Sequence, residues 1–168
     1  EGVSRPGTIL DALGLTLMLT LARLALSLFS GALFAGMRLS ASPVARTLSF
    51  LTLGALRNTP LLMQLFMVYF VVAPVIGVGP FWAAVISLGL FEGAYVAEIF
   101  RAGVMGVPRG QWEAALSLGM PVRLAARDVI VPQAMRQVLP ALAGQLVSLV
   151  KDTSLVSAIA VADLTMRT

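Results

Sequence analysis

Four long apolar stretches make up most of this chain, and they limit the folds open to it more than any other feature. They cover about residues 8–37, 44–75, 81–100 and 128–150. Roughly 20 apolar residues suffice for a helix to cross the hydrocarbon core of a bilayer. Charged residues make up only 12% of the chain, against about 25% in soluble domains. We therefore predict an all-α, polytopic bundle with four transmembrane helices, because a backbone in lipid must satisfy its own hydrogen bonds.

Prolines interrupt two of the four predicted spans. Pro60 lies in the middle of the second span, and Pro132 and Pro140 lie in the fourth. A proline removes one helical hydrogen bond, and its ring clashes with the preceding turn. We therefore expect a kink in the second span and bends in the fourth.

Arginine in the connections between spans indicates which side of the membrane each connection faces. Arg38 and Arg46 lie between the first two spans, and four arginines lie between residues 101 and 127, whereas residues 74–79 carry no charge. Arginine-rich connections face the cytoplasm. We therefore place the N-terminus outside, residue Gln111 in the cytoplasm and residue Val78 outside.

The arginine-rich connection at about residues 102–127 contains a predicted short helix, from about residue 110 to residue 118. Gly119 suits a left-handed helix end, and Pro121 prevents the helix from continuing. At about 1.5 Å per residue this helix is too short to cross a bilayer. We expect it to lie at the membrane surface and to present Trp112, Ala115 and Leu116 to another molecule.

The same connection carries a spaced motif. Glu113, Ala114 and Ala115 are followed by Gly119, and Pro132 follows at a fixed distance, with Val129 and Val131 before it. This spacing resembles the cytoplasmic coupling loop of the permease subunits of ATP-driven (ABC-type) importers. The family's pattern has Ile and Leu where this chain has the two valines, so the apolar character is kept.

Three further stretches narrow the resemblance to the polar amino acid branch of that family. They are residues 57–65 (RNTPLLMQL), 93–101 (GAYVAEIFR) and 151–157 (KDTSLVS). Two positions depart from the branch: Asn58 stands where glycine is usual, and Glu92 stands where a small or amide side chain is usual. The resemblance runs from about Leu10 to the end of the chain.

The resemblance implies a single permease domain over residues 1–168 with the fold of type I ABC importers. A fifth span would follow residue 168, so we expect the sequence to be truncated there. It also implies a bacterial plasma (inner) membrane protein that partners with cytoplasmic ATPase subunits, a second permease subunit in a homodimer or heterodimer, and an external amino-acid-binding protein. The residues implied in coupling to the ATPase are Trp112, Glu113, Ala114, Ala115, Leu116 and Gly119.

The chain itself is not expected to be an enzyme. It has no G-x-x-x-x-G-K phosphate loop, and its single lysine is Lys151, so ATP and Mg would be bound by the partner ATPase. It has no Cys and no His, so we expect no disulfide, no metal site and no Ser-His triad. No basic-aromatic surface suggests nucleic acid.

Polar residues at membrane depth are candidates for the substrate path, because each is costly in lipid. They are Gln64, Glu92, Lys151, Asp152, Thr153 and Ser154. Glu92 either contacts substrate or pairs with another helix, for example through Arg57. The group at residues 151–154 offers a cation, a carboxylate and two hydroxyls to a zwitterion, or is a solvated turn.

Two other charged positions are expected to be structural. Glu98 and Arg101, three residues apart, are expected to pair, and Arg23 either to snorkel or to contact another subunit. The alternative function is a secondary transporter or channel driven by an ion gradient. Glu92 alone speaks for that alternative, because such proteins favour midplane carboxylates and inverted repeats. Which amino acid is carried stays open.

Overall fold

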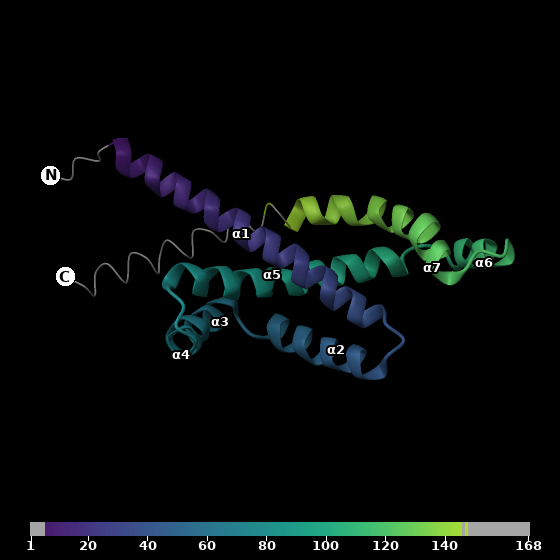
Figure 1. Ribbon diagram of the computed structural model, residues 1–168, viewed down its shortest axis with the longest axis horizontal. Coiled ribbons are helices and arrows are strands. Elements are labelled where there is room, and N and C mark those ends of the chain that lie inside the picture. Colours follow the sequence, from purple (N-terminus) through teal and green to yellow (C-terminus); the bar gives the residue numbers. More distant parts are fainter. Residues whose placement is uncertain (1–5, 146, 148–168) are drawn as a thin grey trace.

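The computed structural model describes residues 6–145 and 147, and in that part of the chain every regular element is a helix. Two helices dominate it: α1 (Pro6–Leu39) and α5 (Pro80–Met105). Both contain stretches long and apolar enough to cross a membrane, at Leu17–Leu39 and Phe81–Met105. The all-α bundle is therefore confirmed, and the first and third predicted spans correspond to α1 and α5 (Figure 1).

The second predicted span is broken much more sharply than a kink. It consists of α2 (Pro43–Asn58) and an arm made of α3 (Leu61–Met67), the π-helical turn η1 (Val68–Val72) and α4 (Ala73–Ile76). The two parts meet at an angle of 105°. In Figure 1, α2 runs along the bundle, whereas α3 and α4 are turned across it. The kink expected at Pro60 is thus present, and it is sharper than expected because both Thr59 and Pro60 leave the helical conformation.

Two π-helical turns each end two residues before a proline. The turn η1 ends at Val72, before Pro74, and the turn η2 (Ala126–Ile130) ends before Pro132. A proline ring clashes with the carbonyl four residues earlier. A π turn, in which the N–H bonds to the carbonyl five residues back, moves that carbonyl aside. The sequence predicted a bend near Pro132, and the structure places a wider turn there.

The chain returns from the surface in two short helices and a long helical stretch. The short helices α6 (Arg109–Ser117) and α7 (Val122–Ala125) lead into η2, and helical residues 131–145 follow without interruption at Pro140. This stretch lies antiparallel to α5: position 103 of α5 packs on Val138, and Glu92 bonds to Gln145. The rest of the predicted fourth span, residues 146–150, lies outside the described part except for residue 147.

The closest helix packing joins α1 to α5, which run in the same direction. A Cβ added at Gly89 would overlap Leu26, one at Gly93 would overlap Ser30, and one at Gly31 would overlap Val96. Small residues at such contacts let helix backbones approach closely. Gly89 and Gly93, four residues apart on α5, thus let α1 and α5 pack tightly.

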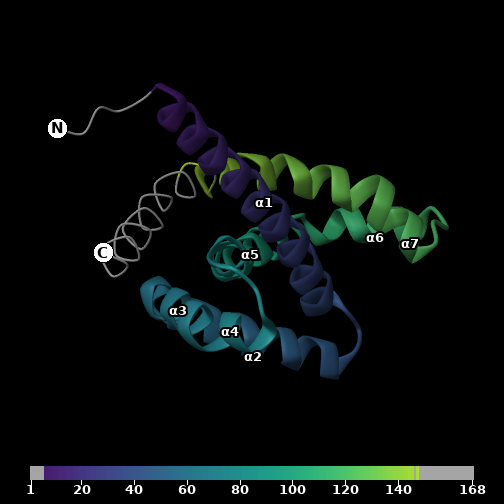
Figure 2. The ribbon, with the colours of Figure 1, turned by 60° about the vertical axis from the view of Figure 1, so that its left-hand side comes forward.

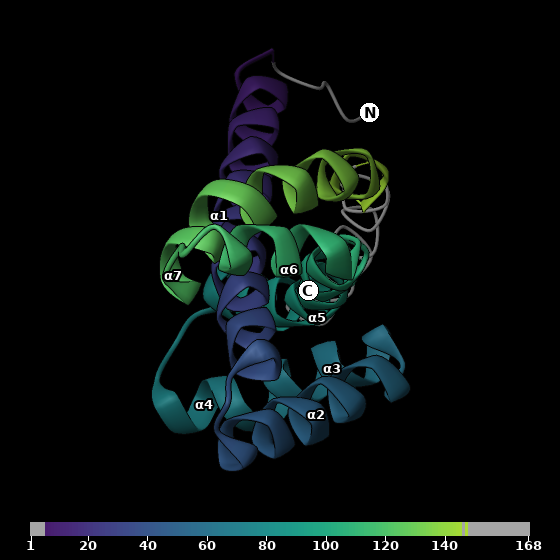
Figure 3. The ribbon, with the colours of Figure 1, turned by 90° about the vertical axis from the view of Figure 1, so that its right-hand side faces the viewer.

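The connections lie at opposite ends of the bundle. The connection between α1 and α2 and the helices α6 and α7 share one end, while the uncharged connection before α5 lies at the other (Figure 1). Figure 2 shows the same arrangement after a turn of 60°, and Figure 3 looks onto the end that carries α6 and α7. The arginine-rich connections thus lie on one side, as the sequence predicted, and the assignment of that side to the cytoplasm stays a prediction.

Candidate functional site

The helix α6 ends in a fully bonded left-handed turn. Gly119 has φ +78°, its N–H donates to the Leu116 carbonyl at 3.0 Å, and the Met120 N–H donates to the Ala115 carbonyl at 3.2 Å. These two bonds define a Schellman motif, in which a left-handed glycine lets the chain satisfy the last helical carbonyls. Both the short helix and the conformation of Gly119 are as the sequence predicted.

One side of α6 is buried against the chain itself. Ala115 is only 4% exposed, and Trp112 packs against a core cluster of Val107, Ile130 and Ala134. Ala115 therefore faces inward, against the expectation that it is presented to another molecule, because α7 and η2 fold back over α6. Trp112 is half-buried, with part of its side chain against this cluster, and its contact with another molecule stays a prediction.

The opposite side of α6 and the following turn are exposed and largely apolar. Glu113 and Ala114 are exposed, and so are Leu116 (44%) and Leu118 (83%). Glu113 forms no ion pair with Arg109 within the described residues. We call this set, with Val122 (63% exposed), the outer face of α6. It is a small surface of apolar side chains with one carboxylate, held on a rigid helix.

A hydrogen bond and a shared core join α6 to two longer helices. The Gln133 side-chain amide donates to Gln111 at 3.0 Å. The core cluster beneath Trp112 includes Ala134 of the helical stretch 131–145 and Val107, which follows α5, and Val104 of α5 packs against it. A force on the outer face of α6 therefore reaches both helices.

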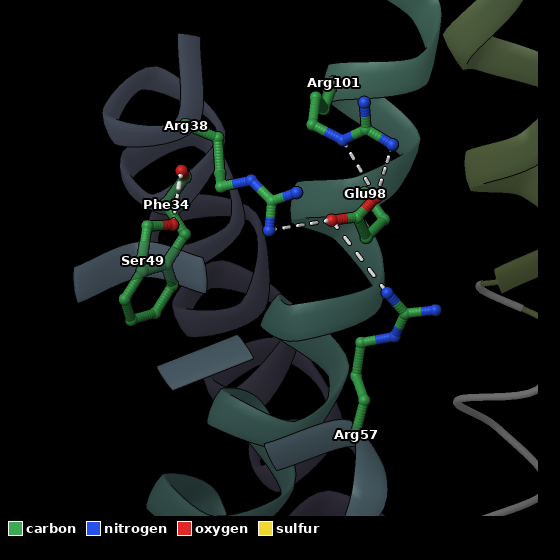
Figure 4. Close-up of polar contacts among 6 residues, drawn as sticks. All are labelled: Phe34, Arg38, Ser49, Arg57, Glu98 and Arg101. Atoms are coloured by element: carbon green, nitrogen blue, oxygen red, sulfur yellow. Dashed lines mark hydrogen bonds and ion pairs between the residues drawn. The ribbon is translucent and has the colours of Figure 1, made fainter. Parts of the chain in front are cut away.

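At the same end of α5, Glu98 lies among three arginines (Figure 4). Arg101 Nε donates a hydrogen bond to Glu98 Oε2 at 2.9 Å, and Arg101 Nη2 forms an ion pair with the same oxygen at 2.8 Å. Arg38 of α1 and Arg57 of α2 lie 3.7 and 3.9 Å from Glu98 Oε1. The predicted pair of Glu98 and Arg101 is confirmed, and the structure extends it to a cluster that ties α1 and α2 to α5.

Nearer the middle of α5, Glu92 is 2% exposed and accepts a hydrogen bond from the Gln145 side chain at 2.8 Å. The expected partner on another helix is thus present, but it is Gln145 and not the example Arg57, which pairs with Glu98 and lies over the Tyr95 ring. Sequence reasoning missed Gln145, although an isolated amide in an apolar span is itself a signal.

Comparison with known proteins now gives these features a context. The family model described as "Binding-protein-dependent transport system inner membrane component" matches residues 27–168. The probable amino-acid ABC transporter permease protein PatM of Vibrio harveyi is 39% identical over 160 residues, covering 93% of this chain and 72% of that protein. The arginine transport system permease protein ArtQ of Bacillus subtilis is 35% identical over 162 residues, covering 95% and 74%.

A solved structure agrees. The crystal structure described as "an amino acid ABC transporter with histidines" matches with a TM-score of 0.79 and 34% identity, covering 99% of this chain and 81% of that chain. The chain belongs to the family of inner membrane components of binding-protein-dependent transport systems. It is thus a permease subunit of the amino-acid ABC type, and these relatives give no support to the ion-gradient alternative.

The other polar residues predicted at membrane depth differ in their surroundings. Gln64 is half-buried, and its side-chain amide donates to the carbonyls of Leu56 and Thr59 rather than pointing freely into a path. The group Lys151, Asp152, Thr153 and Ser154 lies outside the described residues. Arg23 is fully buried in the permease (0% exposed), so the expectation that it snorkels or meets another subunit is wrong.

The permease also has an open cleft of about 420 Å³ between α5 and helical residues 131–145. Its polar lining consists of Tyr95, Glu98, Gln137 and Gln145. The cleft therefore connects the Glu98 cluster with the partner of Glu92. This side of α5 is the polar one, whereas the side that faces α1 is closed by glycine packing.

Proposed function

We propose that this permease forms the translocation path of an ATP-driven amino acid importer in the bacterial inner membrane. The observation that carries the proposal is the rigid α6, whose buried side joins the ends of two long helices and whose outer face is free. A transporter whose own chain lacks a phosphate loop needs a surface through which a separate ATPase can act. The named relatives, which include arginine, glutamine and cystine permeases, support amino acids as the substrate class.

The outer face of α6 would dock into a cytoplasmic ATPase subunit, which would hold ATP and Mg. Glu113, Ala114, Leu116 and Gly119 form or shape the docking surface, while Trp112 and Ala115 transmit motion through the core beneath. ATP binding would bring two ATPase subunits together and move α5 and helical residues 131–145 as one unit, opening the path outward. Hydrolysis would reset the path, so the permease itself performs no chemistry and needs no cofactor.

The path would run along the polar side of α5, between two permease subunits. Glu92 is the candidate contact for the substrate's ammonium group, reached through its partner Gln145. The group at residues 151–154 remains a candidate for the zwitterionic end of the substrate. An external binding protein would deliver the amino acid to the end of the bundle where residues 77–79 lie.

The proposal is tested by substitutions that disturb the left-handed turn at Gly119 and leave the rest of α6 unchanged. Gly119→Val forces a β-branched residue into the left-handed region, which costs about 1–3 kcal/mol, although a Cβ there meets no other atom within 4 Å. Gly110→Val is the matched control, since Gly110 also has open space but no left-handed backbone. Gly119→Asn is the conservative variant, because asparagine tolerates that conformation.

Membrane vesicles that contain the permease, the ATPase and the binding protein would be assayed for ATP-driven uptake of labelled amino acids. We expect Gly119→Val to lose uptake while the permease still inserts, and Gly110→Val and Gly119→Asn to keep most of it. Equal uptake by Gly119→Val and the wild type would contradict the coupling role. Absence of ATP-dependent uptake by the wild type with any amino acid would contradict the proposed function itself.

A further inference from the structure

The break between α2 and α3 leaves backbone carbonyls without their usual partners. In a continuous helix the Leu56 carbonyl would accept from the N–H of residue 60, but Pro60 has no N–H. Thr59 is extended, with φ −100° and ψ 130°, as the residue before a proline usually is. The last turn of α2 therefore needs other donors, because unsatisfied carbonyls in an apolar setting are costly.

Two side chains supply those donors. Thr59 Oγ1 donates to the Ala55 carbonyl at 2.8 Å. Gln64 Nε2 donates both to the Leu56 carbonyl and to the Thr59 carbonyl, the latter at 2.8 Å. A primary amide has two N–H groups, so both donors of Gln64 are used at the break.

These bonds join three consecutive pieces of the chain. Gln64 belongs to the first turn of α3, Leu56 to the last turn of α2, and Thr59 to the residues between them. The backbone N–H of Gln64 also bonds to the Pro60 carbonyl at 3.2 Å. The side chain that replaces the missing N–H thus comes from the far side of the bend, and its bonds exist only while α3 is turned back toward α2.

We propose that Gln64 is a positioning residue that holds the 105° turn and thereby sets where the α3–α4 arm lies against α5. Leu65, the next residue, is 2% exposed, so the arm packs in one defined position once the turn is fixed. The link from this turn to transport rests on the proposed function, whereas the link from Gln64 to the turn does not. Asn58 agrees with this view: it is the last residue of α2 and has no positive φ, so its departure from the usual glycine does not strain the backbone.

The first experiment measures the bend itself. Because the chain has no cysteine, spin labels on Leu48→Cys in α2 and Val75→Cys in α4, which are 56% and 82% exposed, report the distance between the two parts. Gln64→Met keeps the length of the side chain but removes both donors. We expect the population of molecules with the wild-type distance, relative to the population with any other distance, to fall on the order of tenfold. Met63→Leu, on the same turn and 64% exposed, is the control and should leave the distribution unchanged.

The second experiment asks whether Gln64 acts through the N–H that Pro60 lacks. Pro60→Ala supplies that N–H, so Gln64→Met should cause much less further change in a Pro60→Ala background than in the wild type. An equal further change in both backgrounds would mean that Gln64 acts in some other way. An unchanged distance distribution in Gln64→Met alone would overturn the proposal.

The third measurement is amino acid uptake by the assembled transporter. We expect Gln64→Met to reduce the maximal uptake rate on the order of tenfold, with the ATPase still co-purifying, and Gln64→Asn to fail as a rescue because it is one methylene shorter. A changed distance with normal uptake would overturn the positioning role in transport. If the wild type shows no uptake, the proposed function fails, while the distance measurements still decide the role of Gln64 in the turn.

Discussion

Glu98 and Glu92 lie six residues apart on α5, yet the protein treats their charges in different ways. Glu98 lies near the end of the helix with three arginines around it, from α1, α2 and α5. Glu92 is buried nearer the middle and receives a hydrogen bond from the uncharged amide of Gln145. The cluster around Glu98 carries an excess of positive charge and crosses between helices, whereas the bond at Glu92 spans the side of α5 that carries the cleft.

This difference separates a structural carboxylate from a candidate functional one. A carboxylate with several guanidinium partners on neighbouring helices fixes those helices to each other. A buried carboxylate that accepts a hydrogen bond from Gln145, a residue that lines the open cleft, is a candidate contact for a substrate ammonium group. We therefore expect changes at Glu98 to act on assembly and changes at Glu92 to act on uptake.

The largest effect is expected for Glu98→Gln. This change leaves Arg38, Arg57 and Arg101 without their common counter-charge. Removing one partner of a buried pair costs about 3–5 kcal/mol, and the lower end applies because the Glu98 side chain is 21% exposed. The yield of folded permease in detergent, measured by size-exclusion chromatography, should fall strongly. A normal yield would show that the cluster is not a structural one.

The next effect is expected for Gly93→Ala, which changes the helix contact that holds both carboxylates in place. A Cβ at this position would overlap Ser30 and approach the Ser27 carbonyl, and such overpacking costs about 1–3 kcal/mol. Thermal unfolding of the purified permease measures the loss. Gly54→Ala is the matched control, because a Cβ there meets nothing within 4 Å. Equal unfolding temperatures for the two variants would contradict close packing of α1 on α5.

The next effect is expected for Glu92→Gln, which keeps the size of the side chain but removes its charge and replaces one acceptor oxygen by an NH₂ donor. Uptake or its selectivity among labelled amino acids should change, with the loss greatest for cationic ones. Co-purification with the ATPase should stay normal. A fall in assembled complex with unchanged selectivity would place Glu92 in the same structural class as Glu98.

The smallest effect is expected for Arg57→Lys. Lysine keeps the charge near Glu98 but loses the planar guanidinium that lies over Tyr95, with 5.5 Å between the guanidinium carbon and the ring centroid. Since the Arg57 side chain is 42% exposed, the free energy of unfolding should drop by about 0–1 kcal/mol. Arg101→Lys, which loses the Nε hydrogen bond and the short guanidinium ion pair to Glu98, should cost more in the same assay. The reverse order would show that the aromatic contact outweighs the ion pair.

Local features of the fold were readable from the sequence because neighbouring residues decide them. The lengths of the apolar stretches predicted α1 and α5, and Gly119 with Pro121 predicted the end of α6 and its left-handed turn. The pair of Glu98 and Arg101 needed only helical spacing. The prolines predicted kinks and bends in the helices, but neither the π turns nor the angle of 105° between α2 and the arm follows from a proline alone.

For the candidate site, the sequence predicted which residues are involved but not which residues they contact. The sequence marked Glu92 and Gln64 as costly polar groups in lipid, but the partner of each depends on which helices touch and at what height. Gln64 proved to be used by the backbone at the break, and the two members of the Glu92–Gln145 pair lie 53 residues apart. Trp112 and Ala115 lie on α6 as predicted, yet Ala115 is buried and Trp112 half-buried because α7 and η2 fold over them.

The sequence by itself determined that this protein is a helical membrane protein with a capped surface helix, because hydrophobic length, glycine and proline act locally on the backbone. Tertiary structure alone decided how charges on different helices are partnered. Arg38 of α1 and Arg57 of α2 pair with Glu98 of α5, whereas Glu92 bonds to Gln145. The physical reason is that a side chain reaches only a few ångströms from its helix, so the position and angle at which helices meet select its partner.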